Sequence, residues 1–166
     1  MIVLGDYSGL LKKLIHELKY KHVYTLSETL INLVIKHISF DFQKFDFITP
    51  IPLHPKRLQK RGYNQAAELG LSLSRKMPLP FFDNVLLKTR NTKPQMSLVD
   101  TNERKKNMKG VFKINKRINI TGKTIILVDD VSTTGATIFE AAKVLKENGA
   151  KSVWGLVLAR KKPRGY

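Results

Sequence analysis

The stretch Ile125-Ile-Leu-Val-Asp-Asp-Val-Ser-Thr-Thr-Gly-Ala-Thr137 decides the fold of this chain. Its first four residues are apolar, which predicts a short buried strand. Two carboxylates, Asp129 and Asp130, stand where that strand is expected to end, and an apolar-periodic helix is expected to begin near Ile138. A strand that turns through acids and small hydroxyl residues into a helix is typical of a site for a phosphorylated sugar.

The loop after the acids carries the groups that bind a phosphate. The first backbone N–H groups of a helix have no partner inside the helix, and the helix dipole favours an anion beside them. Gly135 allows the backbone to approach that anion closely, and the hydroxyl residues around it add donors. The predicted phosphate site consists of Val131, Ser132, Thr133, Thr134, Gly135, Ala136 and Thr137.

The two acids suit a different part of the same ligand. They cannot hold the phosphate, because like charges repel. Carboxylates suit ribose hydroxyls, or a Mg²⁺ ion that bridges the sugar and a diphosphate. We therefore expect Asp129 and Asp130 to bind ribose, and Mg²⁺ through the ligand. The acid pair beside a phosphate loop indicates a ribose 5-phosphate rather than a free nucleotide.

The run from Ile125 to Thr137 resembles the motif with which type I phosphoribosyltransferases bind phosphoribosyl pyrophosphate (PRPP). That motif is an apolar strand, two acids and a Thr-Thr-Gly-x-Thr loop, and every part of it is present here. The resemblance implies that PRPP is the ligand and that Mg²⁺ accompanies it.

Composition sets limits on the rest of the chain. Its 166 residues, 42% of them apolar, suit one globular domain. Without cysteine it has no disulfide and no cysteine metal site. No apolar run approaches the length of a membrane span, and the N-terminus lacks a signal-peptide pattern, so we expect a cytoplasmic protein. The net charge of +17 favours a polyanionic partner.

Helical and strand patterns alternate along the chain. We expect helices near 10–18, 25–37, 64–76 and 136–147, and strands near 45–51, 84–88, 111–114, 124–129 and 152–159. Residues 89–109 are polar without periodicity and are expected to form a loop. The pattern predicts an α/β fold of the type I phosphoribosyltransferase kind, with a mostly parallel sheet flanked by helices. We expect a single domain over 1–166, comprising N-terminal helices (1–40), an α/β core (45–159) and a basic tail (160–166).

A basic segment is expected beside the acids. Ligands of parallel sheets bind at the carboxyl ends of the strands, so the loop after Ile51 should face the motif. That loop is rich in cations, and guanidinium groups match phosphate oxygens in pairs. We predict that His54, Arg57 and Arg61 bind pyrophosphate.

The same segment carries a second resemblance. Pro50-Ile-Pro-Leu-His54, followed by Arg61-Gly-Tyr-Asn-Gln65, resembles the signature of the ComF family, a branch of the phosphoribosyltransferase fold. The resemblance spans about residues 7–159. It implies a flexible loop that closes over PRPP, with Arg90, Gln95, Arg104 and Lys105 as its candidate residues. Many family members begin with a four-cysteine zinc ribbon. This chain has no cysteine and starts at the first helix, so either this member lacks the ribbon or the chain is a fragment, and we expect no zinc in it.

Two classes of function stay open. The ComF resemblance implies a PRPP-binding protein that handles imported single-stranded DNA in natural competence, with other competence proteins as possible partners. The alternative is a phosphoribosyltransferase with a nucleobase or amine acceptor. No segment is recognisable as an acceptor-binding hood, and Phe81, Phe82 and Trp154 are expected in the core. The candidate nucleic-acid contacts are Lys56, Lys60, Lys106, Lys109, Arg160, Lys161, Lys162 and Arg164.

Overall fold

The computed structural model describes residues 1–20, 25–37, 41–92 and 101–161. Within these ranges a four-stranded sheet has the order β1 (Ile2–Asp6), β6 (Ser152–Arg160), β5 (Thr124–Ser132), β2 (Phe47–Pro50). Each of its neighbouring pairs is parallel. The predicted α/β class with a mostly parallel sheet is confirmed.

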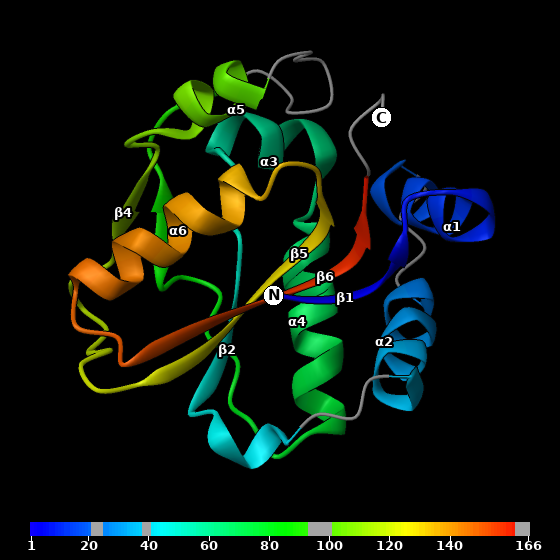
Figure 1. The fold of residues 1–166 in the computed structure, drawn as a ribbon, viewed down its shortest axis with the longest axis horizontal. Coiled ribbons are helices and arrows are strands. Elements are labelled where there is room, and N and C mark those ends of the chain that lie inside the picture. The colour runs from blue at the N-terminus through cyan, green and yellow to red at the C-terminus, as the bar shows by residue number, and fades with distance from the viewer. Residues whose placement is uncertain (21–24, 38–40, 93–100, 162–166) are drawn as a thin grey trace.

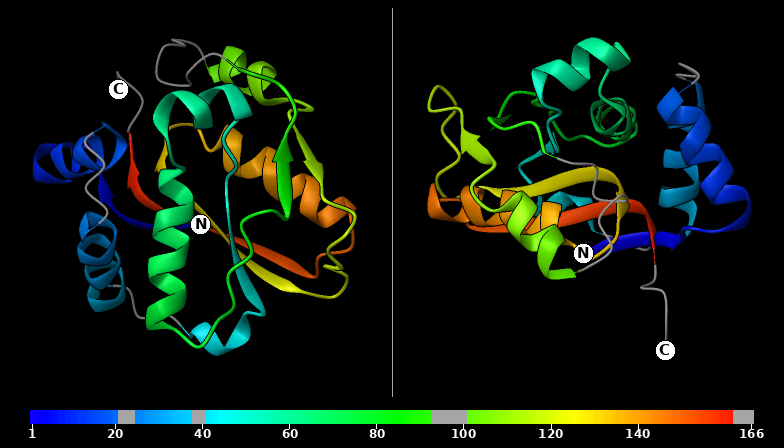
Figure 2. Two further views of the ribbon diagram at one scale, coloured as in Figure 1. Left: turned by 180° about the vertical axis from the view of Figure 1, so that it is seen from behind. Right: turned by 90° about the horizontal axis from the view of Figure 1, so that it is seen from above.

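Helices cover both faces of the sheet (Figures 1 and 2). Helices α1 (Gly9–Tyr20), α2 (Thr25–His37) and α4 (Gln65–Lys76) lie on one side, and α6 (Ala136–Glu147) lies on the other. Side chains of β5 alternate between the two cores. Ile126 and Val128 pack with α1, α2 and α4, whereas Ile125 and Leu127 pack with α6. No helix of the described residues is long and apolar enough to cross a membrane.

A second, smaller sheet stands beside the first. It pairs β3 (Leu86–Lys88) with β4 (Phe112–Ile114) in antiparallel fashion. Between these strands in the sequence lies α5 (Thr101–Met108), which packs against α6. A 3₁₀ turn, η1 (Phe42–Lys44), precedes β2, and α3 (Pro55–Arg61) follows it.

Besides the short turn η1, three of these elements were not expected from the sequence. The strand β1 is a short edge strand, and its five residues are too few for a period to be recognised. In α3, Pro55 occupies the first turn and the His54 side chain caps the helix, a start signal that we interpreted only as a run of charges. The third, α5, replaces part of the expected loop. It is almost wholly polar, and its buried Met108 anchors it in the core.

Other expectations need smaller corrections. The strand β5 continues to Ser132 rather than ending at the acids, and Arg160 is the last residue of β6 rather than part of a tail. Phe82 and Trp154 are 41% and 42% exposed, so they are not core residues. Each rests edge-on against a neighbouring aromatic ring: Phe82 against Phe47, and Trp154 against Phe45.

A glycine in β6 allows α6 to lie close to the sheet. A Cβ atom placed on Gly155 would stand 2.8 Å from Cγ2 of Ile138, in the first turn of α6. That distance is shorter than ordinary contact, and Ile138 is itself buried. The absence of a side chain at position 155 therefore allows the first turn of α6, which follows the expected phosphate loop, to lie close to the sheet.

We predict that Gly155→Ala lowers the free energy of unfolding by about 1–3 kcal/mol, because the added methyl group overpacks this contact. Urea denaturation measures the change. Lys151→Ala, at an exposed position just before the same strand, is the control and should stay within about 0.5 kcal/mol of the parent. A Gly155→Ala protein as stable as the control would contradict the close packing.

Candidate functional site

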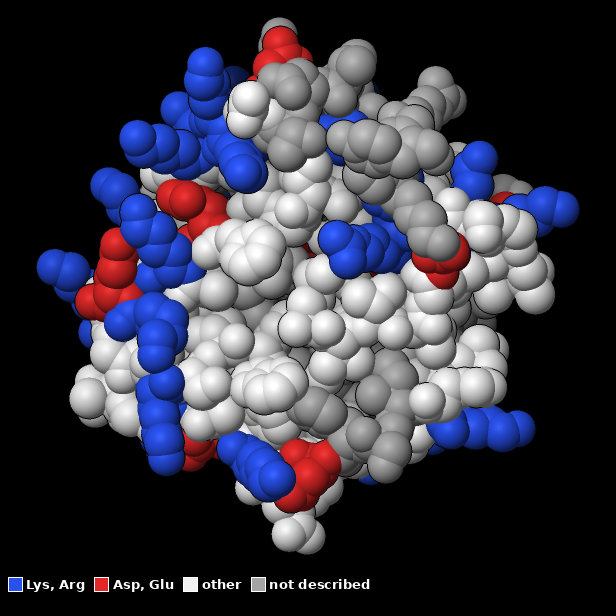
Figure 3. All heavy atoms as spheres, in the orientation of Figure 1, with Lys and Arg blue, Asp and Glu red and all other residues white. Residues whose placement is uncertain are grey.

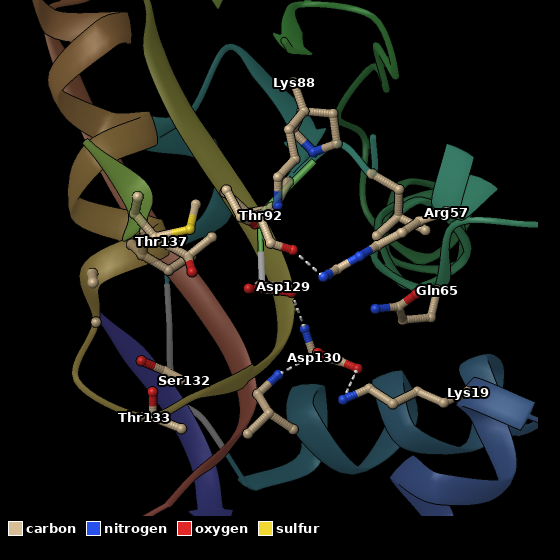
Figure 4. A pocket seen from close by; sticks show the side chains of 18 of the residues that line it. Lys19, Arg57, Gln65, Lys88, Thr92, Asp129, Asp130, Ser132, Thr133 and Thr137 are labelled. Carbon is tan, nitrogen blue, oxygen red and sulfur yellow. Dashed lines mark hydrogen bonds and ion pairs between the residues drawn. The ribbon is translucent and has the colours of Figure 1, made fainter. Parts of the chain in front are cut away.

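The site lies where β5 extends beyond its neighbour β2. The β2–β5 pairing ends at Pro50 and Val128, whereas the β5–β6 pairing continues to Ser132 and Arg160. Beyond Val128 one edge of β5 therefore has no strand of the described residues beside it, and it borders a cavity of about 230 Å³. Figure 4 shows this cavity from close by.

The phosphate loop forms one wall of the cavity. Gly135 is the N-cap of α6 with a φ of 80°, and a Cβ atom there would stand 2.7 Å from a carbon of the Phe139 ring. A side chain at this position would therefore be both strained and blocked. The Ser132 hydroxyl is buried without a hydrogen-bond partner and lines the cavity. A buried polar group without a partner is costly, so this hydroxyl is suited to a ligand.

The loop residues do not all face the cavity. Val131, Ser132, Thr133, Gly135, Ala136 and Thr137 are among the lining residues. The remaining member, Thr134, is used within the loop, where its Oγ1 accepts a 3.4 Å hydrogen bond from the backbone N–H of Ala136. The structure thus brings six of the seven predicted phosphate-site residues to one wall.

The two acids are held in different ways. Oδ1 of Asp129 accepts a 2.9 Å hydrogen bond from the N–H of Asp130, and Oδ1 of Asp130 accepts a 2.7 Å hydrogen bond from the N–H of Val131. Oδ2 of Asp130 forms a 2.7 Å ion pair with Nζ of Lys19, at the end of α1. Both oxygens of Asp130 are therefore engaged.

This arrangement shifts the proton affinities of the groups around the acids. Burial, with the charge of Asp130 added to it, raises the pKa of Asp129 from 3.8 to about 7. Burial alone would lower the pKa of Lys19, but the charge and hydrogen bond of Asp130, with the charge of Asp129, outweigh it and raise that pKa above 10.5. Lys19 and Asp130 are therefore held as a charged pair, while Asp129 titrates near neutral pH.

Cations form the opposite wall. Arg57 and Arg61 come from α3, and Lys88 comes from the end of β3. An Arg57 N–H donates to the backbone oxygen of Thr92, and an Arg61 N–H donates to the side-chain oxygen of Gln65. Burial, and then the charge of Arg57, lower the pKa of Lys88 to about 8. These cations face the acids across the cavity, where a bound anion would be attracted to them.

Several predicted site residues lie elsewhere. His54 caps α3 through Nδ1, which accepts from the N–H of Lys56 at 3.3 Å, and it is not among the described residues that line the cavity. Arg90 donates to the carbonyls of Asn107 and Lys109 at the end of α5. Arg104 and Lys105 lie on α5 away from the cavity lining. Gln95 is outside the described residues.

Two charged residues of the site, Lys19 and Lys88, were not among the site residues predicted from the sequence. Both line the cavity. A weak signal existed for Lys19, because it directly follows buried Leu18 on a helix whose other lysines, Lys12 and Lys13, are exposed. Lys88 gave no such signal, since its position depends on the pairing of β3 with β4.

Comparisons with known proteins identify the family of this chain. A model of the phosphoribosyl transferase domain matches residues 58–166. Competence protein F of Haemophilus influenzae is 32% identical over 167 residues, which cover 96% of this chain and 72% of that protein. This chain is a member of the ComF family. The DNA utilization protein YhgH of Escherichia coli is likewise 32% identical over 165 residues, covering 96% of this chain and 71% of YhgH.

Solved structures support the fold of this ComF family member. Adenine phosphoribosyltransferase from Thermoanaerobacter pseudethanolicus superposes with a TM-score of 0.51 at 16% identity, covering 85% of this chain and 83% of that chain. The glutamine PRPP amidotransferase of B. subtilis superposes with a TM-score of 0.54 at 16% identity. The match covers 81% of this chain but only 26% of the amidotransferase chain. The predicted fold and family are confirmed.

We predict that Asp129 makes the stability of the ligand-free protein depend on pH. The folded protein holds the proton of Asp129 more tightly than the unfolded chain does. The free energy of unfolding should therefore fall as the pH rises from 3.8 to about 7. Asp129→Asn should remove this fall and stabilise the protein at pH 7.5 by about 1–2 kcal/mol, after allowance for solvent screening.

Urea denaturation at a series of pH values measures the effect. Asp83→Asn, which changes an exposed carboxylate, is the control and should leave the pH dependence unchanged. Asp129→Asn could instead destabilise the protein at neutral pH and leave the free energy of unfolding as dependent on pH as in the parent. That result would refute the burial of an unbalanced charge at position 129.

Proposed function

We propose that this chain binds PRPP in the cavity and acts in DNA uptake as a ComF-type protein that handles imported single-stranded DNA in the cytoplasm. One observation carries the PRPP part of the proposal. A phosphate loop with a buried, unpartnered hydroxyl, an acid pair and a basic wall line one cavity. The names of the relatives, competence protein F and DNA utilization protein, support the DNA part.

A different group of cavity residues suits each part of PRPP. The 5-phosphate would bind Ser132 and the first turn of α6, where backbone N–H groups and the helix dipole favour an anion. The ribose hydroxyls would donate to Asp129. The diphosphate would lie against Arg57, Arg61 and Lys88, whose charges suit its oxygens.

Magnesium fits this site through the ligand rather than through the protein alone. Among the described residues, no three His, Cys, Asp or Glu side chains are grouped so as to hold a metal ion. Asp129 is the carboxylate best placed to share Mg²⁺ with the oxygens of PRPP, because both oxygens of Asp130 are engaged. When bound, Mg²⁺ would neutralise charge on the diphosphate.

We predict that Arg57→Ala weakens PRPP binding about 10- to 100-fold, as expected for the loss of a charge-assisted contact. Titration calorimetry in the presence of Mg²⁺ measures the affinity. The matched control is Lys60→Ala, which removes an exposed cation of the same helix that does not line the cavity, and it should change the affinity less than about threefold. Equal losses in the two variants would refute a specific diphosphate contact.

The surface also suits a polyanion. Figure 3 shows Lys and Arg side chains along the margin of the molecule on which α5, β4 and α6 lie. These elements pack against one another, so their exposed cations can act together. They include two of the predicted nucleic-acid contacts, Lys106 and Lys109. The exposed basic residues of this basic margin are Lys105, Lys106, Lys109, Lys113, Lys116, Arg117, Lys143 and Lys146.

The other candidate contacts are distributed over different places. Lys56 and Lys60 are exposed on α3, and Arg160 is exposed at the end of β6. Lys161 is half-buried and its backbone N–H donates to the carbonyl of Ser132. Lys162 and Arg164 are outside the described residues. The basic margin is therefore the broadest described surface for a nucleic-acid backbone.

We predict that single-stranded DNA binding weakens steeply and linearly on a plot of log affinity against log salt, with a slope of about −0.7 per phosphate neutralised. The variant Lys106→Glu/Lys109→Glu/Lys113→Glu should flatten this slope. Lys12→Glu/Lys13→Glu, which changes exposed lysines of α1, is the control and should keep the parent slope. Fluorescence anisotropy at several salt concentrations measures both, and an affinity independent of salt would refute electrostatic binding.

An enzyme remains a second candidate because of the β3–β4 sheet. The sequence analysis recognised no acceptor-binding hood. The structure nevertheless places Lys88 at the end of β3, with its Nζ 5.7 Å from the ring centre of Phe112 in β4. Met108 and Ile138 give the cavity apolar lining nearby. A planar acceptor such as a nucleobase would suit such a wall. Release of pyrophosphate from PRPP, assayed with a panel of nucleobases and amines, distinguishes this enzyme from a binding protein.

A further inference from the structure

Helix α1 contributes a cation to the cavity from outside the phosphoribosyltransferase match, which begins at residue 58. Its apolar face, which includes Ile15 and Leu18, is buried against the sheet. Lys19 follows Leu18 at the end of the helix, and Figure 4 shows its side chain directed toward Asp130. The Lys19 side chain is only 13% exposed and that of Asp130 only 5%.

This placement gives each oxygen of Asp130 a partner within the protein. Oδ1 accepts from the N–H of Val131 at 2.7 Å, and Oδ2 lies 2.7 Å from the Lys19 ammonium. Both acids line the cavity, but only one oxygen of Asp129 is bonded to the backbone. A ligand that took the place of Lys19 at Oδ2 of Asp130 would have to break their ion pair. Breaking a buried ion pair is costly, because it leaves both charges without a partner.

The charges around the cavity lead to the same assignment. Among the described residues, four cations line it together with the two acids, namely Lys19, Lys88, Arg57 and Arg61. With Lys19 neutralising Asp130, three cations remain opposite one carboxylate. Without Lys19, Asp130 would be an unbalanced anion in the wall that receives a polyanionic ligand.

We infer that Lys19 is a resident counter-ion of the acid pair: it holds Asp130 in place in the PRPP complex as in the free protein, and leaves Asp129 as the carboxylate that meets the ribose. The inference rests on the proposed function. It makes Lys19 a positioning residue, because it acts on the ligand through Asp130. It also separates the roles of the two acids, whereas the sequence motif predicted that both Asp129 and Asp130 bind ribose.

Calorimetric titration with PRPP, in Mg²⁺ and in EDTA, tests the inference. Lys19→Met should weaken binding about tenfold or more in EDTA, since Asp130 then repels the ligand, and saturating Mg²⁺ should restore most of the affinity. Lys19→Arg, which keeps the charge, should behave as the parent. An equal loss with and without Mg²⁺, or no loss in either, would overturn the inference.

The acid variants provide a second comparison in the same assay. Asp129→Asn should weaken PRPP binding at least about tenfold, whereas Asp130→Asn should weaken it less than about threefold, because only Asp129 meets the ligand. Equal losses would show that Asp130 also contacts PRPP and would overturn the inference.

Amine labelling separates the inference from the proposed function. Acetylation followed by mass spectrometry should modify Lys19 more slowly than Lys13, an exposed lysine of the same helix, and Asp130→Asn should remove that protection. PRPP should leave Lys19 protected. A parent protein that fails to bind PRPP would refute the proposed function. Equal labelling of Lys19 and Lys13, or release of Lys19 by PRPP, would overturn the counter-ion role.

Discussion

The site depends on the unequal lengths of two neighbouring strands. Because β2 turns away at Pro50 while β5 continues to Ser132, the described part of the chain places a strand on only one side of the backbone beyond Val128. The cavity opens along that edge, and the acids, the phosphate loop and the start of α6 follow in order along it. Gly155 allows the first turn of α6 to lie close to the sheet, and Gly135 supplies the positive φ at which that helix begins.

Electrostatics then determines what the cavity can hold. Burial of Asp129 beside Asp130 would be unfavourable without nearby cations, and Lys19 and Lys88 supply them from α1 and β3. The cavity thus keeps charged groups in place before any ligand arrives. Sites preorganised in this way favour an anion because little reorganisation is needed on binding. The basic margin on α5, β4 and α6 is a separate feature, and it lies outside the cavity lining.

Local signals predicted most of the fold. The bounds 25–37 and 136–147 were correct for α2 and α6, because apolar periodicity is a local signal. Sequence patterns failed for β1, a short strand that pairs with the distant β6, and for α5, whose polar sequence folds because Met108 packs in the core. Within the site, the motif identified Asp129, Ser132 and Gly135, but the local pattern at His54 described a helix cap rather than a ligand contact.

The sequence by itself determined the α/β class, the family and the motif that carries the acids and the phosphate loop, because these are written in contiguous residues. Only the tertiary structure decided which side chains surround that motif. Lys19 is 111 residues away from Asp130 along the chain, yet their side chains are 2.7 Å apart. Contacts of this kind depend on how helices and strands pack over a sheet, and no local pattern in a single sequence records that packing.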